Sequence, residues 1–241
     1  MENKLSNLIN DNIDISKITE EFKNNKVVVI QNFLKPEFAE SFYQWFTEDM
    51  PADWWEVSSC PAYGNEKPSF VRNTQDNQDL IRERYQEALD AFGSGKFAYN
   101  FYRTLENHIE NCDCTECQIR QWLVDSECLD FISTVTDEKY VDSDEVFAAC
   151  YMQGDFLSPH VDSPNGTLGF VLQLTKDWMP EYGGLLHFMD DERKIVERIE
   201  VPEFNSLTLF YLPKNKGKWH FVSAVSPGTP EVRLTYTGWF K

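Results

Sequence analysis

The pattern of apolar and polar residues divides the chain into a front part rich in predicted helices and a back part of short predicted strands. Residues 3–23 predict one or two short helices, and the β-branched run at 27–30 predicts a strand over residues 25–33. Pro36 marks the start of another helix, because the apolar residues after it recur at helical spacing. Residues 77–93 and most of 104–137 are also predicted helical. The alternation in 96–103 predicts a strand.

Beyond residue 145 the chain consists of short apolar segments separated by Gly, Pro, Asn and Asp. These turn residues predict strands rather than helices, and several strands at such spacing are typical of a barrel or jelly roll. The expected fold is therefore mainly β with α, in which the N-terminal helices form a support layer outside the β core. We expect residues 1–144 as the support region and 145–241 as the core of one shared domain. The predicted strands are 146–152, 168–175, 184–189, 194–201, 206–211, 219–225 and 232–240.

Residues 50–76 are predicted to be irregular, since they are rich in Pro, Gly, Ser and Asn. This stretch nevertheless carries Trp54, Trp55, Tyr63 and Phe70. Two interpretations stay open: a lid or substrate wall, or a loop held to the core by its aromatic side chains.

Charge and composition narrow the range of partners. The 241 residues include 22 Lys and Arg against 40 Asp and Glu, a net charge of −18, and most of the excess lies in the first 150 residues. A chain with this much negative charge should repel phosphate backbones. We therefore expect no nucleic-acid partner. It has no apolar stretch long enough for a membrane span and no secretory signal pattern, which favours the cytoplasm. We therefore expect the six cysteines to be thiols or metal ligands.

The candidate chemistry begins with a His-x-Asp pair, His160 and Asp162, just after a predicted strand. Residues i and i+2 of an extended chain project from the same face, so both side chains can reach one metal ion. His220 lies on another predicted strand. Two histidines and one carboxylate on one face of Fe(II) leave three open positions, which suit a 2-oxo acid and O2. Taken alone, a His-x-Asp pair favours a surface turn over a metal site.

The longer sequence context carries a resemblance. Residues 146–241 resemble the prolyl-hydroxylase branch of the Fe(II)/2-oxoglutarate oxygenases, with the closest similarity to the hypoxia-inducible-factor prolyl hydroxylases and a frame shared with collagen-type prolyl 4-hydroxylases. The resemblance implies a double-stranded β-helix, the jelly roll of this superfamily. It rests on the segments YMQGDFLSPHVDSPNGTLGFVLQLTKDWMPEYGGLLHF, LTLFYL, WHFVSAV and VRLTYTGWF, taken in order.

The resemblance also implies roles for individual residues. His160, Asp162 and His220 match the iron-binding and catalytic triad. Arg233 matches the basic residue that pairs with the distal carboxylate of 2-oxoglutarate, a task for which a guanidinium is suited because it binds carboxylates bidentately. Thr237 and Tyr151 match positions that hydrogen-bond the same cosubstrate. Fe(II), 2-oxoglutarate and O2 are the implied cofactors, with ascorbate as a supporting reductant.

Two positions depart from the family pattern. Gln173 stands where the hypoxia-factor enzymes have a second tyrosine that contacts the cosubstrate. The loop SPNGTLGF lacks an arginine that commonly follows the His-x-Asp pair. Asp162 itself is present, whereas halogenating relatives carry a small residue there, so the pattern favours hydroxylation.

The implied activity is that of a 2-oxoglutarate-dependent dioxygenase (EC 1.14.11 type) that hydroxylates a C–H bond, with a prolyl residue of a protein or peptide as the favoured substrate. One alternative is a free amino acid or another small metabolite. A second is a jelly-roll protein that binds a metal or ligand without turnover. The intact triad and Arg233 argue against this second alternative. Composition gives no prediction of the oligomeric state.

A second group of candidate metal ligands lies in the front part of the chain, where His108, Cys112, Cys114 and Cys117 follow one another closely. Four such soft ligands can hold Zn²⁺ tetrahedrally. The Cys-x-Cys spacing and the predicted helix around it are less usual for zinc than paired Cys-x2-Cys motifs, so plain thiols are the competing interpretation.

Overall fold

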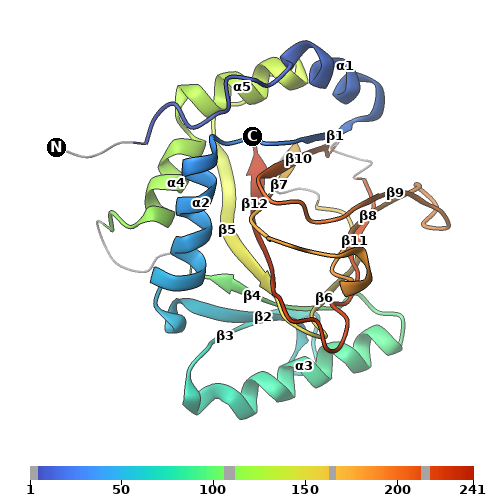
Figure 1. Cartoon of the computed structure of the whole chain (residues 1–241). Coiled ribbons are helices and arrows are strands. Elements are labelled where there is room, and N and C mark those ends of the chain that lie inside the picture. Colours follow the sequence, from blue (N-terminus) through green and yellow to red (C-terminus); the bar gives the residue numbers. More distant parts are fainter. Residues whose placement is uncertain (1–4, 106–111, 163–166, 213–217) are drawn as a thin grey trace.

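The computed structural model describes residues 5–105, 112–162, 167–212 and 218–241. As predicted, most helices precede residue 145 and short strands follow it (Figure 1). Within these ranges no helix is both long and apolar enough to cross a membrane. The α-helices are α1 (Ile15–Asn25), α2 (Pro36–Gln44), α3 (Gln78–Gly93), α4 (Thr115–Leu123) and α5 (Ser126–Thr136).

The strands are all connected through one sheet that curls on itself, and the paired strands run antiparallel. Their bounds are β1 (Val27–Ile30), β2 (Trp55–Ala62), β3 (Lys67–Arg72), β4 (Tyr99–Thr104), β5 (Ser143–Tyr151), β6 (Phe156–His160), β7 (Leu168–Gln173), β8 (Leu186–Met189), β9 (Val196–Glu200), β10 (Ser206–Tyr211), β11 (His220–Val222) and β12 (Arg233–Phe240).

Strand β4 joins the two halves of the sheet. The order β1-β10-β7-β12-β5 forms one half and β6-β11-β8-β9 the other. One part of β4 pairs with β5, through Tyr102 and Arg103, and an earlier part pairs with β6, through Tyr99 and Asn100. The curled antiparallel arrangement confirms the predicted double-stranded β-helix with helices outside it.

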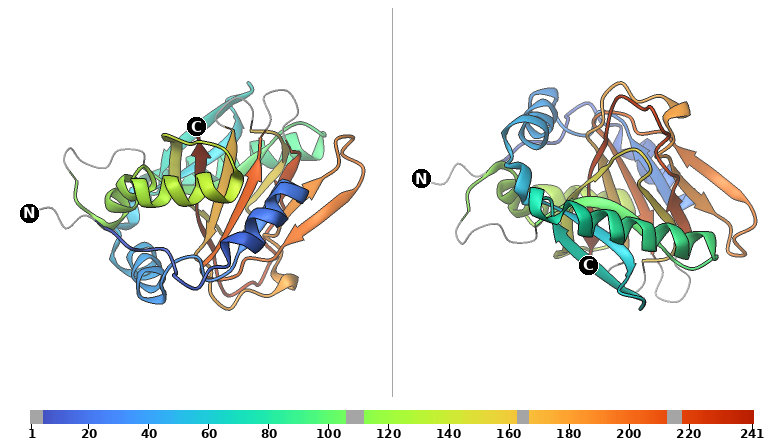
Figure 2. Two further views of the ribbon diagram at one scale, coloured as in Figure 1. Left: turned by 90° about the horizontal axis from the view of Figure 1, so that it is seen from above. Right: turned by 90° about the horizontal axis from the view of Figure 1, so that it is seen from below.

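Alternation along the strands separates an outer core from an inner lining. On β5, Ala148 and Cys150 face an outer core, whereas Phe147, Ala149 and Tyr151 face the interior of the curled sheet. The outer core also takes apolar side chains from all four helices that cover this face, α1, α2, α4 and α5. Figure 2 (left) shows α1 and α5 lying across the strands. Because the helices cover only this face, the opposite face of the sheet can line a cavity.

The outer core joins segments that are far apart in the chain. Trp122 of α4 packs against Phe33, and Phe46 packs against Tyr236 of β12. Truncating a fully buried aromatic side chain to alanine typically costs about 3–5 kcal/mol, so such contacts can hold the helical layer to the sheet. The division of the chain at residue 145 stays a prediction based on sequence character.

Residues 50–76 are not the irregular stretch that the sequence predicted. They contain the hairpin of β2 and β3, whose register runs from Glu56↔Arg72 to Ser59↔Ser69. Pro68 suggested a loop, but β3 pairs only with β2, and an edge strand tolerates a missing N–H. The prediction that residues 50–76 are irregular is therefore wrong, whereas Phe70 of this hairpin does line the cavity described below.

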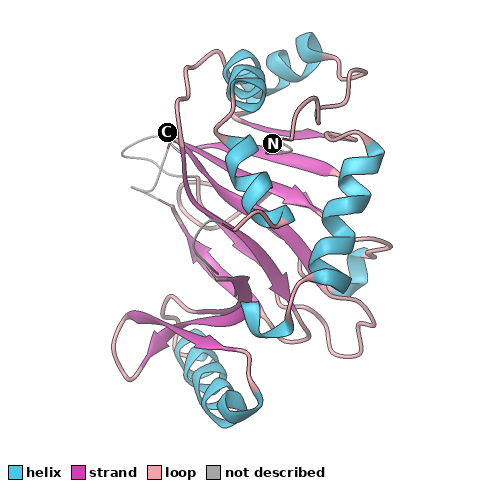
Figure 3. Ribbon diagram, turned by 90° about the vertical axis from the view of Figure 1, so that its left-hand side faces the viewer, coloured by secondary structure: helices cyan, strands magenta, loops and turns pink. Residues whose placement is uncertain are grey.

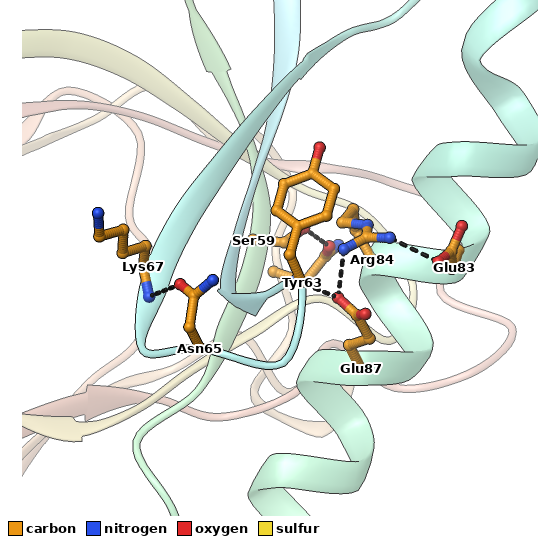
Figure 4. Close-up of polar contacts among 8 residues, drawn as sticks. Ser59, Tyr63, Asn65, Lys67, Glu83, Arg84 and Glu87 are labelled. Carbon is orange, nitrogen blue, oxygen red and sulfur yellow. Dashed lines mark hydrogen bonds and ion pairs between the residues drawn. The ribbon is translucent and has the colours of Figure 1, made fainter.

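The aromatic side chains of this segment divide between core and surface. Trp54 and Trp55 pack against the outer core, so they do not form the wall of a peptide cleft. The hairpin lies beside α3 at one end of the sheet (Figure 3). At its turn, Tyr63 lies over the guanidinium of Arg84, 4.0 Å from the ring centre, and the Tyr63 amide donates to Glu87 (Figure 4). These contacts hold the hairpin to α3.

Two smaller differences concern the ends of elements. The predicted helices over residues 3–23 reduce to α1, which begins at Ile15 because Asp14 caps it by accepting from the Lys17 amide at 3.0 Å. Strand β6 was absent from the predicted strands, because the proline of its sequence FLSPH is unfavourable in a strand interior. His160 is the last residue of β6, so the His-x-Asp pair begins within a strand that was not predicted, instead of just after a predicted one.

Candidate active site

The two histidines of the predicted triad lie side by side because their strands pair. His220 opens β11 directly opposite His160 at the end of β6, and their ring centres are 4.3 Å apart. Asp162 follows His160 by two residues. Its Oδ1 lies 3.0 Å from His160 Nε2 and its Oδ2 lies 3.2 Å from His220 Nε2. The predicted triad is therefore brought together.

Backbone carbonyls fix which nitrogen of each histidine is available. The Nδ1 of His160 lies 3.0 Å from the Ser158 carbonyl oxygen, and the Nδ1 of His220 lies 2.8 Å from the Lys218 carbonyl oxygen. A carbonyl only accepts, so both Nδ1 atoms carry the proton and donate it. In each ring Nε2, which faces Asp162, is then the nitrogen available to a metal, and hydrogen bonding of the second nitrogen is the usual arrangement of metal-bound histidine.

The three donor atoms match the requirements of an octahedral Fe(II) site. All lie within 4.8 Å of one another. Adjacent ligands of an octahedral ion with bonds of about 2.1 Å are about 3 Å apart, and each histidine Nε2 lies about that far from one of the two Asp162 oxygens. Two imidazoles and one carboxylate are also the donor set of non-haem Fe(II) oxygenases. The residues present therefore fit the metal that the sequence predicted.

The electrostatics of the triad show how strongly its members interact. Burial by itself would raise the pKa of Asp162, but the positive potential of His220 and hydrogen bonds with both imidazoles lower it well below its usual range. For His220, burial favours the neutral ring, yet Asp162 more than offsets this and raises the pKa. A metal ion would take the place of the protons between the imidazoles and the carboxylate, because metal binding requires neutral histidine and ionised carboxylate ligands.

Arg233 lies at the start of β12, opposite Tyr151 of β5. Its side chain is only 2% exposed, its guanidinium carbon lies 4.9 Å from the centre of the Tyr151 ring, and its Nε has no hydrogen-bond partner. No carboxylate of the described residues forms an ion pair with it. Burial lowers the pKa of Arg233, and Tyr151 partly offsets this effect. A buried guanidinium without a carboxylate partner fits a carboxylate that arrives with a ligand.

The other two predicted cosubstrate residues also line the cavity. Tyr151 is buried, and burial raises the pKa of its hydroxyl although Arg233 acts in the opposite direction, so it is a neutral hydrogen-bonding group. The hydroxyl of Thr237 donates to the Phe170 carbonyl oxygen at 2.7 Å. Donation to a cosubstrate would require the hydroxyl to leave this carbonyl. The roles of both residues stay predictions.

The triad and Arg233 open into a single cavity of about 800 Å³ inside the curled sheet. Its wall follows from strand alternation, because every second residue of β4, β5 and β12 points inward. Phe97, next to β4, also contacts the ring of His160, with centres 5.7 Å apart. The inward residues are Tyr99, Phe101 and Arg103 of β4, Glu145, Phe147, Ala149 and Tyr151 of β5, and Arg233, Thr235, Thr237 and Trp239 of β12.

A charged pair in this wall was not predicted from the sequence. Arg103 of β4 and Glu56 of β2 both line the cavity, and their side chains approach to 3.3 Å. The guanidinium of Arg103 also lies over the rings of Phe147 and Phe70, at 4.8 and 5.0 Å. The alternation of residues 97–103 could have indicated an inward Arg103. Its partner could not be found, because residues 50–76 were taken as irregular.

The predicted zinc ligands lie elsewhere in the chain. Cys112, Cys114 and Cys117 come together at the start of α4, with their sulfur atoms within 4.8 Å of one another. His108, the fourth predicted ligand, lies outside the described residues. The structure thus gathers three of the four predicted ligands.

Comparison with known proteins gives a family match. Residues 146–241 match the family model of the 2OG-Fe(II) oxygenase superfamily. No curated protein sequence matches the chain significantly.

Similar solved structures cover nearly the whole chain. An oxidoreductase of the 2OG-Fe(II) oxygenase family from Burkholderia pseudomallei is 13% identical, with a TM-score of 0.59 over 96% of this chain and 92% of that chain. A Pseudomonas putida prolyl-4-hydroxylase is 16% identical, with a TM-score of 0.52 over 98% of both. A prolyl hydroxylase from Trichoplax adhaerens, solved with a hypoxia-inducible-factor oxygen degradation domain peptide, is 17% identical, with a TM-score of 0.51 over 94% and 88%.

At such low identities these structures establish the fold alone, so the family match and the assembled site carry the assignment. The matched segment contains His160, Asp162, His220 and Arg233, which the structure places in one cavity. Residues 146–241 thus match the 2OG-Fe(II) oxygenase superfamily and carry the metal triad of an enzyme of the EC 1.14.11 type, for which the match implies Fe(II) and 2-oxoglutarate as cofactors.

Proposed function

We propose that the chain hydroxylates a prolyl residue within a peptide or protein. The observation that carries this proposal is the shape and lining of the cavity beyond the triad. Drug-sized ligands occupy pockets of about 300–1,000 Å³, so a cavity of about 800 Å³ has room for 2-oxoglutarate and for part of a second, larger molecule.

The rim of the cavity supports a peptide rather than an enclosed small molecule. Phe70 and Phe97 both line it, yet they are 49% and 46% exposed. Large apolar side chains that stay exposed beside a site are typical of surfaces that contact another molecule. A proline ring and its neighbouring residues could pack against these two faces while the prolyl C–H bond lies near the triad.

The residues of this chain would divide the work as follows. His160, Asp162 and His220 would hold Fe(II), which supplies the activation of O2 for the oxidative decarboxylation of 2-oxoglutarate and the hydroxylation of a C–H bond. Arg233 would bind the distal carboxylate of 2-oxoglutarate by charge-assisted hydrogen bonds, and Tyr151 would donate a hydrogen bond beside it. The aromatic wall of β4 and β5 would exclude water from the reacting groups.

Rim variants test the peptide proposal. Phe70→Ser should raise the KM for a proline-containing peptide several-fold and leave the KM for 2-oxoglutarate unchanged, because the side chain lies at the rim. Phe92→Ser is the matched control, since Phe92 is equally exposed, at 51%, and does not line this cavity. Succinate formation and the addition of one oxygen, followed by mass spectrometry, are the measurements. An unchanged peptide KM in Phe70→Ser would count against this binding surface.

The Glu56–Arg103 pair favours a second candidate, a free amino acid substrate. A carboxylate and a guanidinium side by side in the cavity wall could bind the ammonium and carboxylate groups of a free amino acid. A panel of free amino acids, proline-bearing peptides and cell extract distinguishes the two functions. Hydroxylation of a free amino acid without any peptide or protein product would replace the first proposal by the second.

A further inference from the structure

Three cysteines converge where the chain enters α4. Cys112 lies in the preceding segment, Cys114 is the residue that caps the helix, and Cys117 lies in its first turn. Their sulfur atoms are all within 4.8 Å of one another, and all three side chains are partly buried. None of the three is in a disulfide. Together with the iron triad, this is one of two groups of potential metal ligands in the described parts of the chain.

The arrangement fits a tetrahedral metal better than a set of unrelated thiols. Zinc–sulfur bonds of about 2.3 Å place two sulfur ligands about 3.8 Å apart, which is within the spread of these three atoms. Cys114 and Cys117 also stand at the N-terminus of a nine-residue helix, where the positive end of the helix dipole favours thiolates. Three sulfur donors select a soft ion and exclude Mg²⁺ or Ca²⁺.

We propose that Cys112, Cys114 and Cys117 bind a structural zinc ion that holds the start of α4 in place. The sequence-based set also contained His108, but the three cysteines carry the proposal. The zinc proposal does not depend on which substrate is hydroxylated, and it would stand if that substrate were a free amino acid.

The contacts of α4 show what such an ion would stabilise. Glu116, completely buried in the first turn, accepts from the Thr104 hydroxyl at 2.6 Å and from Arg120 at 2.8 Å. The Thr104 hydroxyl oxygen in turn accepts from the Ala148 amide of β5 at 3.0 Å. Arg120 lines the active-site cavity and donates to the Leu105 carbonyl at 3.3 Å. The zinc would thereby support the β4–β5 wall of that cavity.

Metal analysis of purified full-length protein tests the proposal. We expect wild type, purified without chelator, to retain one zinc that survives the loss of the iron triad, so His160→Ala should also retain it. The triple variant Cys112→Ser/Cys114→Ser/Cys117→Ser should lose it. Cys60→Ser is the matched control, because Cys60 is a thiol outside the cluster. Equal zinc in the triple variant and in wild type would overturn the assignment.

Two further measurements keep the proposal testable if the triple variant does not fold. Cobalt added to metal-free His160→Ala protein should give the near-ultraviolet charge-transfer band of thiolate ligands, which a histidine–carboxylate site cannot give. Zinc should protect Cys112, Cys114 and Cys117 from maleimide, as mapped by peptide mass spectrometry. Absence of the band, lack of protection, or a disulfide between any two of these cysteines in freshly purified protein would refute it.

Discussion

Replacement of Arg233 by glutamine should separate cosubstrate binding from folding. The guanidinium is buried, and the described part of the chain offers it no carboxylate. The unpaired charge therefore lowers the stability of the folded protein when no ligand is bound. Arg233→Gln removes that charge and keeps a polar side chain of similar length. The variant without 2-oxoglutarate should therefore unfold with a free energy equal to wild type or higher, by up to roughly 1–4 kcal/mol.

The same substitution should nearly abolish the stabilisation that 2-oxoglutarate provides. Losing charge-assisted hydrogen bonds to a carboxylate costs about 2.7 kcal/mol, or about 100-fold in affinity. At a cosubstrate concentration 100 times the wild-type Kd, wild type gains about 2.7 kcal/mol of stability by mass action. A variant that binds about 100-fold more weakly gains only about 0.4 kcal/mol under the same conditions.

Urea unfolding without O2, with Mn²⁺ in place of Fe(II) and with and without 2-oxoglutarate, measures both quantities. Arg84→Gln is the control, because Arg84 is equally buried but forms ion pairs with Glu83 and Glu87 at 2.6 and 2.7 Å. It should lose stability and keep the full response to 2-oxoglutarate. The reasoning is refuted if Arg233→Gln keeps that response, or if it is destabilised by several kcal/mol without ligand.

Two further predictions concern the triad and a buried acid. His160→Ala should bind iron far more weakly and form no succinate, while its circular dichroism and melting temperature stay near wild type; wild-type succinate production would contradict the triad. For Asp155, burial outweighs hydrogen bonds from the Met152 amide and Asn100 and raises the pKa from 3.8 to about 7. The folded state thus holds this proton more tightly than the unfolded state, so the stabilisation is complete below pH 3.8 and is lost as pH rises through about 7. Asp155→Asn should reduce the fall in unfolding free energy between pH 3.8 and about pH 7, by roughly 1.4 kcal/mol per unit of pKa difference removed; an unchanged profile would show that Asp155 titrates normally.

Local patterns were sufficient to predict the metal ligands. The spacing of His160 and Asp162 places both side chains where one ion can reach them, whatever the rest of the fold does. Arg233 was predictable for a similar reason, since alternation along one strand sets its direction together with that of Thr235. The family resemblance of residues 146–241 then indicated that His220 and Arg233, which lie on other strands, belong to the same site. Local geometry and family pattern agreed at this site, and the structure brings its members together.

Pairings between distant segments were not predictable in the same way. The hairpin of β2 and β3 contains Pro61 and Pro68, which local rules assign to turns, and only its place at the edge of the sheet makes Pro68 tolerable. The Glu56–Arg103 pair depends on the register between β2 and β4, in which these two residues are direct partners. No pattern within either segment encodes that register. A wrong element assignment therefore concealed a charged feature of the active-site wall.

Unsatisfied polar atoms argue for a pocket that takes a polar ligand. The register pairs Gln173 of β7 with Thr235 of β12, two residues beyond Arg233. Gln173 is buried, and neither its amide oxygen nor its amide nitrogen has a hydrogen-bond partner among the described residues; the same holds for the indole nitrogen of Trp239. Each such atom costs about 1–3 kcal/mol, which a protein without a polar ligand has no reason to retain. Trp239 lines the same cavity as Arg233 and the triad, so its unsatisfied donor suits a ligand such as a 2-oxo diacid, which presents oxygen acceptors at both ends.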